Sequence, residues 1–484
     1  MASEKDDLLI WSMQGFDQGL VTNVAAHNLD GDASPDAENF NPSVRYMLQK
    51  RLGTTNFTGN HGSPTGTLIK GLAAFTYENG TTEIIAKEGT AIYNVTAGNW
   101  NTTITGHPAL SDGDGVHFVM FKNVVIMTSE EAAPIAPQKK SVGGTFSALG
   151  GSPPSGQYCC IHSGRVWIAG TAADPSRVYF SAVNNHEDWS TADNAGNFYC
   201  APGDGMVING IASDGETLYI SKKAPTGSEG AIYMVSGNSA ASFTPPRRIC
   251  WEGVPNARCF TITKSFLAAA ISSGIYGLQG NRLVFLSDAV NDQWRSLTVA
   301  QQAVACIGRW KDQIWVAYPA SGSTNTKGLI VDINYQNWSR YNPVAIGMFC
   351  THPDGTLYGA SATSTIKVMQ MNTGADDQGS AITMYWNTPD IDYGQWFLDK
   401  KWREMSLHVK NQAVTWTITH TIDGTNPGDS VTMVGNTEGP VKFFYGLASE
   451  TPGRFFRFKI SESNATLTGE AYGIMTAAES FGRR

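Results

Sequence analysis

The feature that most limits the fold is a pair of short apolar runs that recurs between about residues 67 and 376. In one copy, the run 207–212 is followed by Ser213, Asp214 and Gly215 and then by the run 217–220. Asp-Gly and Asn-Gly pairs tolerate the positive φ that tight hairpin turns require. The copies recur at a spacing of about 42–52 residues, a range typical of propeller blades. They begin near residues 68, 116, 158, 207, 258, 305 and 346.

Several copies are followed by a further pair of strand-like runs, for example 231–235 and 328–333. Two hairpins in each repeat make a four-stranded blade. The aromatic residues that close the units are expected to pack between blades rather than to stack on a ligand. They are Trp100, Trp189, Trp294 and Trp338. The sequence therefore predicts an all-β protein with a β-propeller of six or seven degenerate blades, since the copy at 258–277 is irregular.

The chain divides into three parts. Residues 1–66 are rich in Asn, Asp, Gly and Pro and predict an extended N-terminal arm. Residues 67–376 form the predicted propeller, and residues 377–484 contain longer alternating runs at 403–410, 415–422 and 454–460. Such alternation indicates one buried and one solvated face, as in a β-sandwich. A set of separate sandwiches is the alternative architecture, but the repeat spacing favours the propeller.

Charge and cysteine usage indicate the setting. The formal net charge is −8, and no long basic run is present that would grip DNA phosphates. An acidic wall would instead let DNA slide, although ordinary solubility is the simpler explanation of the charge. The pairs Lys139-Lys140 and Arg247-Arg248 are flanked by prolines and are expected in exposed loops. Seven cysteines without a C-x-x-C pair predict free, buried thiols made in a reducing cytoplasm. No secretory start or membrane-spanning run is expected.

A search for chemistry predicts no catalytic residue, no metal and no cofactor. The zinc-protease, nucleophile-elbow and phosphate-loop motifs are all absent from the sequence. The segment 30–41 begins like a calcium loop, but Pro35 and Asn41 occupy the positions that need glycine and glutamate. Propeller glycosidases use two carboxylates across a pocket. No pattern pairs the acidic residues that could serve, which are Asp174, Glu187, Asp204, Glu252 and Asp288.

Four segments carry a family resemblance. They are GFDQGL at 15–20, DASPDAENFNP at 32–42 with LQKRLGTT at 48–55, RFFRFKI at 454–460, and GEAYGI at 469–474 before GRR at 482–484. In this order they resemble virion proteins of tailed bacteriophages. The chain is most similar to the tail nozzle, or packaged-DNA stabilisation, family of short-tailed phages.

The resemblance implies a non-enzymatic structural role in the virion tail, after synthesis in the bacterial host cytoplasm. Such proteins form a six-fold ring below the portal and adaptor. The ring extends the DNA channel, retains packaged DNA without specific binding and docks fibres or a needle. Lys50, Arg51 and Gly53 are candidates for docking the arm on a neighbouring subunit, and the alternative is a plain basic turn. The alternative is a receptor-facing propeller that binds or cleaves host surface glycan.

Overall fold

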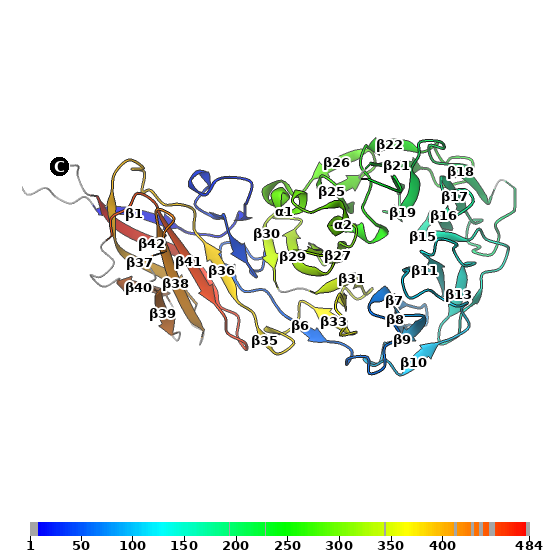
Figure 1. Cartoon of the computed structure of the whole chain (residues 1–484), viewed down its shortest axis with the longest axis horizontal. Helices are drawn as coiled ribbons and strands as arrows, with labels where there is room; N and C mark the ends of the chain where they lie inside the picture. Colours follow the sequence, from blue (N-terminus) through cyan, green and yellow to red (C-terminus); the bar gives the residue numbers. More distant parts are fainter. Residues whose placement is uncertain are drawn as a thin grey trace, which may run out of the picture.

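The computed structural model describes residues 8–480 except 193, 228, 343–344, 411–413, 427–429, 435–438 and 445–450. The chain forms a ring of β-sheets at one end and a β-sandwich at the other, with N-terminal residues running between them (Figure 1). The predicted all-β architecture, a propeller with an N-terminal arm and a C-terminal sandwich-like domain, is confirmed.

The ring is a seven-bladed propeller with four antiparallel strands in each blade. The first five blades are separate sheets, and the last two are parts of larger sheets. The first three blades comprise β7 (Ile69–Thr76), β8 (Thr82–Glu88), β9 (Ala91–Asn94) and β10 (Thr102–Ile104), then β11 (Val116–Phe121), β12 (Val124–Ser129), β13 (Gln138–Ser141) and β14 (Ser147–Ala148), then β15 (Gly156–His162), β16 (Arg165–Thr171), β17 (Arg177–Phe180) and β18 (Gly196–Tyr199). Each of the seven apolar pairs in the sequence contributes strands to a separate blade, including the irregular copy at 258–277.

The remaining blades complete the circle. They comprise β19 (Val207–Ser213), β20 (Thr217–Lys223), β21 (Gly230–Ser236) and β22 (Arg247–Cys250), then β23 (Phe260–Ile262), β24 (Leu267–Ile271), β25 (Gly274–Gln279) and β26 (Arg282–Phe285), then β27 (Cys306–Trp310), β28 (Gln313–Pro319), β29 (Asn325–Asp332) and β30 (Trp338–Tyr341), and finally β31 (Ile346–Thr351), β32 (Leu357–Ser361) and β33 (Val368–Met371) with β6 (Thr54–Asn56). The first strand of the seventh blade, β31, contacts β7 of the first and closes the ring.

The seventh blade takes its outer strand from the N-terminal arm. β6 pairs antiparallel with β33, with Met369 opposite Asn56 and Met371 opposite Thr54. On its other edge, β6 pairs with β34 (Asp376–Asp377), which forms a small hairpin with β35 (Ser380–Ala381). Segments from opposite ends of the repeat region therefore close the propeller together.

The cores of the propeller lie between neighbouring blades. β16 is buried along its whole length, because a blade inside the ring is covered on both faces. Trp294 and Trp338 are almost fully buried, and Trp100 and Trp189 pack at the edges of other inter-blade clusters. The indole N–H of Trp294 donates to the carbonyl of Ile271 at 2.7 Å. These four residues pack between blades, as predicted.

The sandwich is built from two sheets. One contains β1 (Leu8–Met13), β42 (Glu470–Ser480), β37 (Lys400–Val409) and β40 (Gly439–Phe444), with β5 (Leu48–Gln49) on β42. The other contains β36 (Met384–Asn387), β41 (Phe456–Glu462), β38 (Thr415–Ile422) and β39 (Ser430–Val434). Through β4 (Ala37–Glu38), this second sheet continues into β30 of the sixth blade. Hydrogen-bonded strands thus run without a break from propeller to sandwich.

The other elements are short. β2 (Gly19–Leu20) and β3 (Ala33–Ser34) pair beside β30. The helical turns are η1 (Ala26–Asn28), η2 (Ala257–Cys259), η3 (Asp288–Val290), α1 (Asn291–Arg295) and α2 (Val299–Gln302). Among the described residues, no helix is long and apolar enough to cross a membrane.

One expectation about loops is wrong in part. Lys139 and Lys140 belong to β13, and the side chain of Lys140 is buried against Glu83 of the first blade, with 2.6 Å between Nζ and Oε2. Arg247 and Arg248 also lie in a strand, β22, but both are exposed. The sequence around Lys140 contains no sign of Glu83, because the partner comes from another blade.

Candidate functional site

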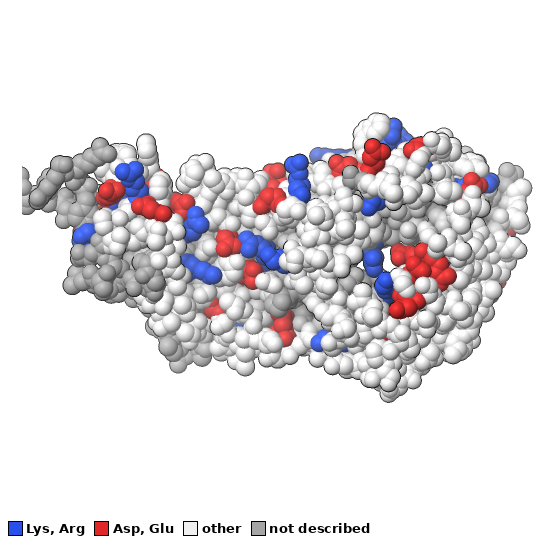
Figure 2. All heavy atoms as spheres, in the orientation of Figure 1, with Lys and Arg blue, Asp and Glu red and all other residues white. Residues whose placement is uncertain are grey.

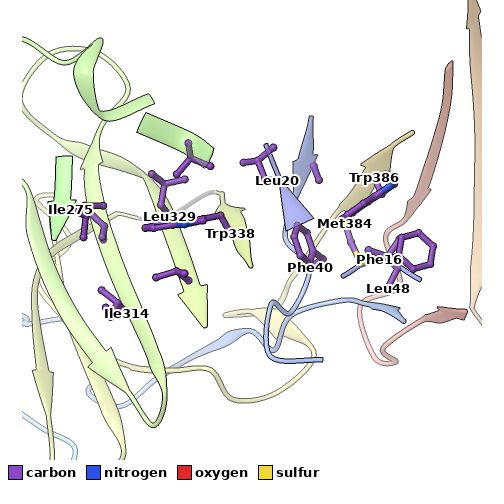
Figure 3. Close-up of a cluster of buried hydrophobic side chains, with 14 of the residues drawn as sticks. Phe16, Leu20, Phe40, Leu48, Ile275, Ile314, Leu329, Trp338, Met384 and Trp386 are labelled. Carbon is purple, nitrogen blue, oxygen red and sulfur yellow. The ribbon is translucent and has the colours of Figure 1, made fainter. Parts of the chain in front are cut away.

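The three residues predicted to dock the arm lie where the propeller meets the sandwich. Lys50, Arg51 and Gly53 lie between β5, which pairs with the sandwich strand β42, and β6, which completes the seventh blade. A single buried cluster extends through this junction (Figure 3). It includes Trp338 from the propeller, Phe16 and Phe40 from the arm and Trp386 from β36, with both phenyl rings meeting the Trp386 indole edge to face.

Lys50 holds the arm on the sandwich. Its Nζ lies 3.2 Å from Glu462 Oε1, and both side chains are fully buried. The same ammonium donates to the carbonyl of Leu467 at 2.8 Å and to the carbonyl of Asn464. Burial raises the pKa of Glu462, while the backbone N–H of Asn464 and the Lys50 charge oppose that shift. A buried ion pair of this kind stays favourable only because further hydrogen bonds complete it.

Arg51 holds the arm on the propeller. Its guanidinium makes two hydrogen bonds to Asp377, of 2.5 and 3.1 Å, and lies 3.7 Å from the centre of the Tyr341 ring. Arg51 Nε donates to Asn39 Oδ1 at 2.7 Å. A planar guanidinium that both forks onto a carboxylate and stacks on an aromatic ring cannot be replaced by lysine without loss of geometry.

Asn39 connects three segments of chain. Its side-chain amide donates to the carbonyls of Asn342 and Thr383 at 2.7 and 2.9 Å, and its oxygen accepts from the Asn342 backbone N–H. Its φ of 61° is a left-handed conformation that asparagine tolerates better than most residues. Asn39 is one of the two asparagines in the segment at 32–42 that carries the phage resemblance.

Gly53 is required by close packing. A Cβ at this position would lie 1.7 Å from the carbonyl oxygen of Asp376, so that any larger residue would displace the β34 segment. Together, Lys50, Arg51 and Gly53 anchor the arm within its own chain. Because the side chains of Lys50 and Arg51 are only 0% and 2% exposed, the docking they provide in this structure is intramolecular.

A second group of polar residues surrounds the opening of the propeller. Figure 2 shows an opening with acidic side chains on one rim and basic side chains on the other. The loop before β11 and the end of β12 carry four carboxylates, which are Asp112, Asp114, Glu130 and Glu131. Lys70 and Arg258 line a small cavity of about 110 Å³. The Lys70 ammonium also donates to the carbonyl of Gly113, between Asp112 and Asp114.

The pKa of Glu130 is strongly lowered. Burial would raise its pKa, but a 2.8 Å hydrogen bond to His117 Nε2, the His117 charge and Arg258 outweigh burial and lower it to about 2. The His117 ring also meets Tyr158 at 5.3 Å between centroids. This arrangement keeps Glu130 ionised and hydrogen-bonded to His117, which does not suit a proton-transfer role near neutral pH.

Four of the five acidic residues considered for glycosidase chemistry each have a separate partner. Asp174 pairs with Arg177, Glu187 with Lys139 and Asp204 with Lys222, at 3.2, 2.5 and 2.7 Å. The Glu252 carboxylate accepts from the Ser273 backbone N–H, and Asp288 begins η3. In the described part of the chain, no group of three or more His, Cys, Asp or Glu residues could hold a metal ion.

Sequence reasoning missed the partners that make the junction. Asp377 and Glu462 lie more than three hundred residues from the arm in sequence, and no local pattern marks either as a partner. At the opening of the propeller, His117, Glu130 and Arg258 also belong to no chemical motif. Asn39 lies in a segment with the family resemblance, and His117 and Arg258 lie at the starts of repeat copies that predict strands but no polar partner.

Comparison with known proteins identifies no family. No family model matches the chain, and neither does any curated protein. Among solved structures, the chain is similar to the extracellular domain of BT4673 from B. thetaiotaomicron, with 11% identity and a TM-score of 0.46, covering 87% of this chain and 60% of that one. Kuenenia stuttgartiensis hydrazine synthase has 11% identity and a TM-score of 0.43, covering 65% and 98%. A catalytically inactive virginiamycin B lyase from Staphylococcus aureus has 11% identity and a TM-score of 0.41, and the match covers 67% of this chain and 99% of that one. These values assign no function.

Proposed function

We propose that this chain is a structural protein of a bacteriophage tail, forming a nozzle ring below the portal and adaptor. One observation carries the proposal. The arm residues of the phage-like segments, with Asn39, Lys50 and Arg51 among them, meet at the junction and join propeller and sandwich into one body. The phage-like segment 454–460 supplies most of β41, which lies in the same continuous sheet. These residues therefore serve architecture.

A ring around a DNA channel needs subunits that keep their shape under load. Two domains joined by a continuous sheet and a shared buried cluster provide such a subunit. A closed ring also needs two different contact surfaces on each subunit, which meet head to tail. Exposed apolar side chains on the sandwich suit such contacts, including Leu8 and Ile10 on β1 and the Trp396–Phe397 pair. The acidic balance suits a lumen through which DNA slides.

Localisation in the particle tests the proposal. An antibody against this chain is applied to intact particles of the phage that encodes it, and the particles are imaged by electron microscopy. Label at the distal end of a short tail is the expected result. Label on peripheral fibres would favour the receptor-facing alternative, and the absence of the chain from purified particles by mass spectrometry would overturn a virion role.

Ring formation can be measured separately on purified chain. Native mass spectrometry, alone and with portal and adaptor proteins, is expected to detect a six-fold assembly. A chain that remains monomeric with both proteins present would contradict the nozzle and leave a different virion position to be sought.

A further inference from the structure

A cavity of about 330 Å³ lies at the seam where the propeller closes. Its walls come from five parts of the chain: β6, the end of β30, the start of β31, the β32–β33 loop with β33, and the β34–β35 hairpin. This volume is within the range of small-ligand pockets, about 300–1,000 Å³. A ligand bound here would touch both the arm strand and the blade that the arm completes.

Lys367 is an unpaired cation on the wall of this cavity. It is partly buried, and its Nζ donates to the side-chain oxygen of Gln378. No carboxylate of the described residues lies within ion-pair distance of it, and burial lowers its pKa without an opposing charge. A partly desolvated ammonium without a counter-ion is a favourable place for an anionic ligand group.

Asp377 does not oppose an anion at this site as strongly as its charge suggests. Both of its oxygens accept hydrogen bonds from Arg51, and Thr54 Oγ1 donates to Oδ1 at 3.2 Å. The carboxylate is thereby neutralised, yet an ionised carboxylate offers about four lone-pair sites and can accept further hydrogen bonds. Arg51 and Lys367 carry two positive charges and Asp377 carries one negative charge, so these three groups leave one net positive charge at the pocket.

The rest of the lining suits a polyhydroxylated molecule. Hydroxyl groups predominate among the polar side chains, supplied by Thr54, Ser361, Thr363, Thr365 and Ser380. The apolar part is made of Ile346, Met369, Met371 and the Tyr341 ring. The Tyr341 hydroxyl is buried beside the cavity and has no hydrogen-bond partner within the described chain. Sugars present this same combination of hydroxyl edges and apolar C–H faces.

We infer that this cavity binds a carboxylate-bearing sugar, with Lys367 pairing with the carboxylate and Asp377, Gln378 and the hydroxyl side chains contacting the sugar hydroxyls. A neutral sugar would leave the Lys367 charge uncompensated. The same chemistry is presented by a free sugar acid and by the terminal uronic acid of a polysaccharide. This inference does not depend on the proposed tail role, because it rests on the pocket alone.

Calorimetric titration of the full chain tests the inference. Galacturonate and glucuronate are the probes, and galactose and glucose are the matched neutral sugars. We expect at least one acid to bind at least tenfold more tightly than its neutral counterpart and to raise the melting temperature, since a ligand that binds only the folded chain stabilises it. Lys367→Met should weaken binding of the acid at least tenfold, while Lys264→Met, at an exposed ion pair with Asp312, should not change it.

Two results would overturn the inference. One is no heat and no thermal shift with either acid at millimolar concentration. The other is equal binding of acid and neutral sugar, or of wild type and Lys367→Met, with unchanged melting temperature in the absence of ligand. Short oligogalacturonides distinguish the two ligand sources. Tighter binding than the monomer indicates the end of a polysaccharide, and equal or weaker binding indicates a free sugar acid.

Discussion

Replacing Lys50 with methionine is expected to loosen the sandwich from the arm. The change removes the partner of Glu462, whose side chain is fully buried and lies 3.2 Å from Lys50 Nζ. Breaking one side of a buried ion pair costs about 3–5 kcal/mol, because the remaining charge stays desolvated. Lys50→Met should therefore lower the free energy of unfolding of the sandwich by about that amount at pH 7. The assay is urea denaturation combined with hydrogen exchange of β41 and β42 amides.

The pH dependence and a second substitution separate this cause from a simple packing defect. In Lys50→Met, burial of Glu462 is no longer opposed by the lysine, so its already raised pKa should rise further. A carboxyl whose folded pKa is raised stabilises the fold below its unfolded pKa and loses that contribution as pH rises through the folded pKa. The loss in free energy of unfolding caused by Lys50→Met should thus be smallest near pH 4 and largest at neutral pH.

The double variant Lys50→Met, Glu462→Gln removes the unpaired charge. It should recover part of the loss and leave about 1–3 kcal/mol, since the carbonyls of Asn464 and Leu467 lose a donor. Lys264→Met, at an exposed pair, should cost no more than about 1 kcal/mol. The reasoning is refuted if the cost of Lys50→Met does not change with pH and the double variant is no more stable than the single one.

Four further predictions follow from the packing and the titrating groups. In urea denaturation, Gly53→Ala should lower the free energy of unfolding by about 3 kcal/mol or more, because its Cβ would meet a carbonyl oxygen. Gly59→Ala, with open space around it, should change the free energy of unfolding by less than about 0.5 kcal/mol, and equal effects would contradict the packing argument. Tyr341→Phe should stabilise the ligand-free chain by about 1 kcal/mol in the same assay, since it deletes a buried hydroxyl without a partner; a loss would mean that the hydroxyl is satisfied. The pKa of Glu130 is lowered to about 2, so its stabilising contribution is present above its usual pKa and is lost as pH falls toward 2; Glu130→Gln should flatten the fall in urea midpoint over that range, and an unchanged slope would refute the assignment. A thiol reagent at pH 8 should leave most cysteines of the folded chain unreacted and should modify all seven after unfolding. The reason is that burial raises the thiol pKa to about 12 at Cys159, Cys200, Cys259 and Cys306. Rapid reaction of these four thiols in the folded chain would contradict the prediction.

Local pattern explains how the propeller could be predicted. Each blade begins with an apolar hairpin whose turn residues are adjacent in sequence, so both the strands and their pairing are visible locally. The pairing of β19 with β20 is a direct example. The long strands β37, β38 and β41 were also predicted from local pattern, in their case the alternation of apolar and polar residues.

The arm and its contacts could not be predicted in the same way. β4 and β6 contribute only two or three residues each, and their partners lie far away in the chain. Short segments carry little periodic signal, and nothing near Lys50 or Arg51 specifies that Glu462 and Asp377 will face them. The sequence predicted that these two residues dock the arm on a neighbouring subunit, whereas the partners that they contact in this structure, Glu462 and Asp377, belong to the same chain.

The pairing of β1 with β42 and of β6 with β33 has a consequence for biosynthesis. Both arm strands leave the ribosome long before their partners are made. The partner of β1 is β42, the last strand of the described chain, and the partner of β6 is β33, the third strand of the last blade. Until then Leu8, Leu9, Ile10 and Trp11 form an unpaired apolar edge of the kind that promotes aggregation. We expect the nascent chain to need protection by a chaperone until β42 has been made, and the sandwich to acquire its final stability only after that.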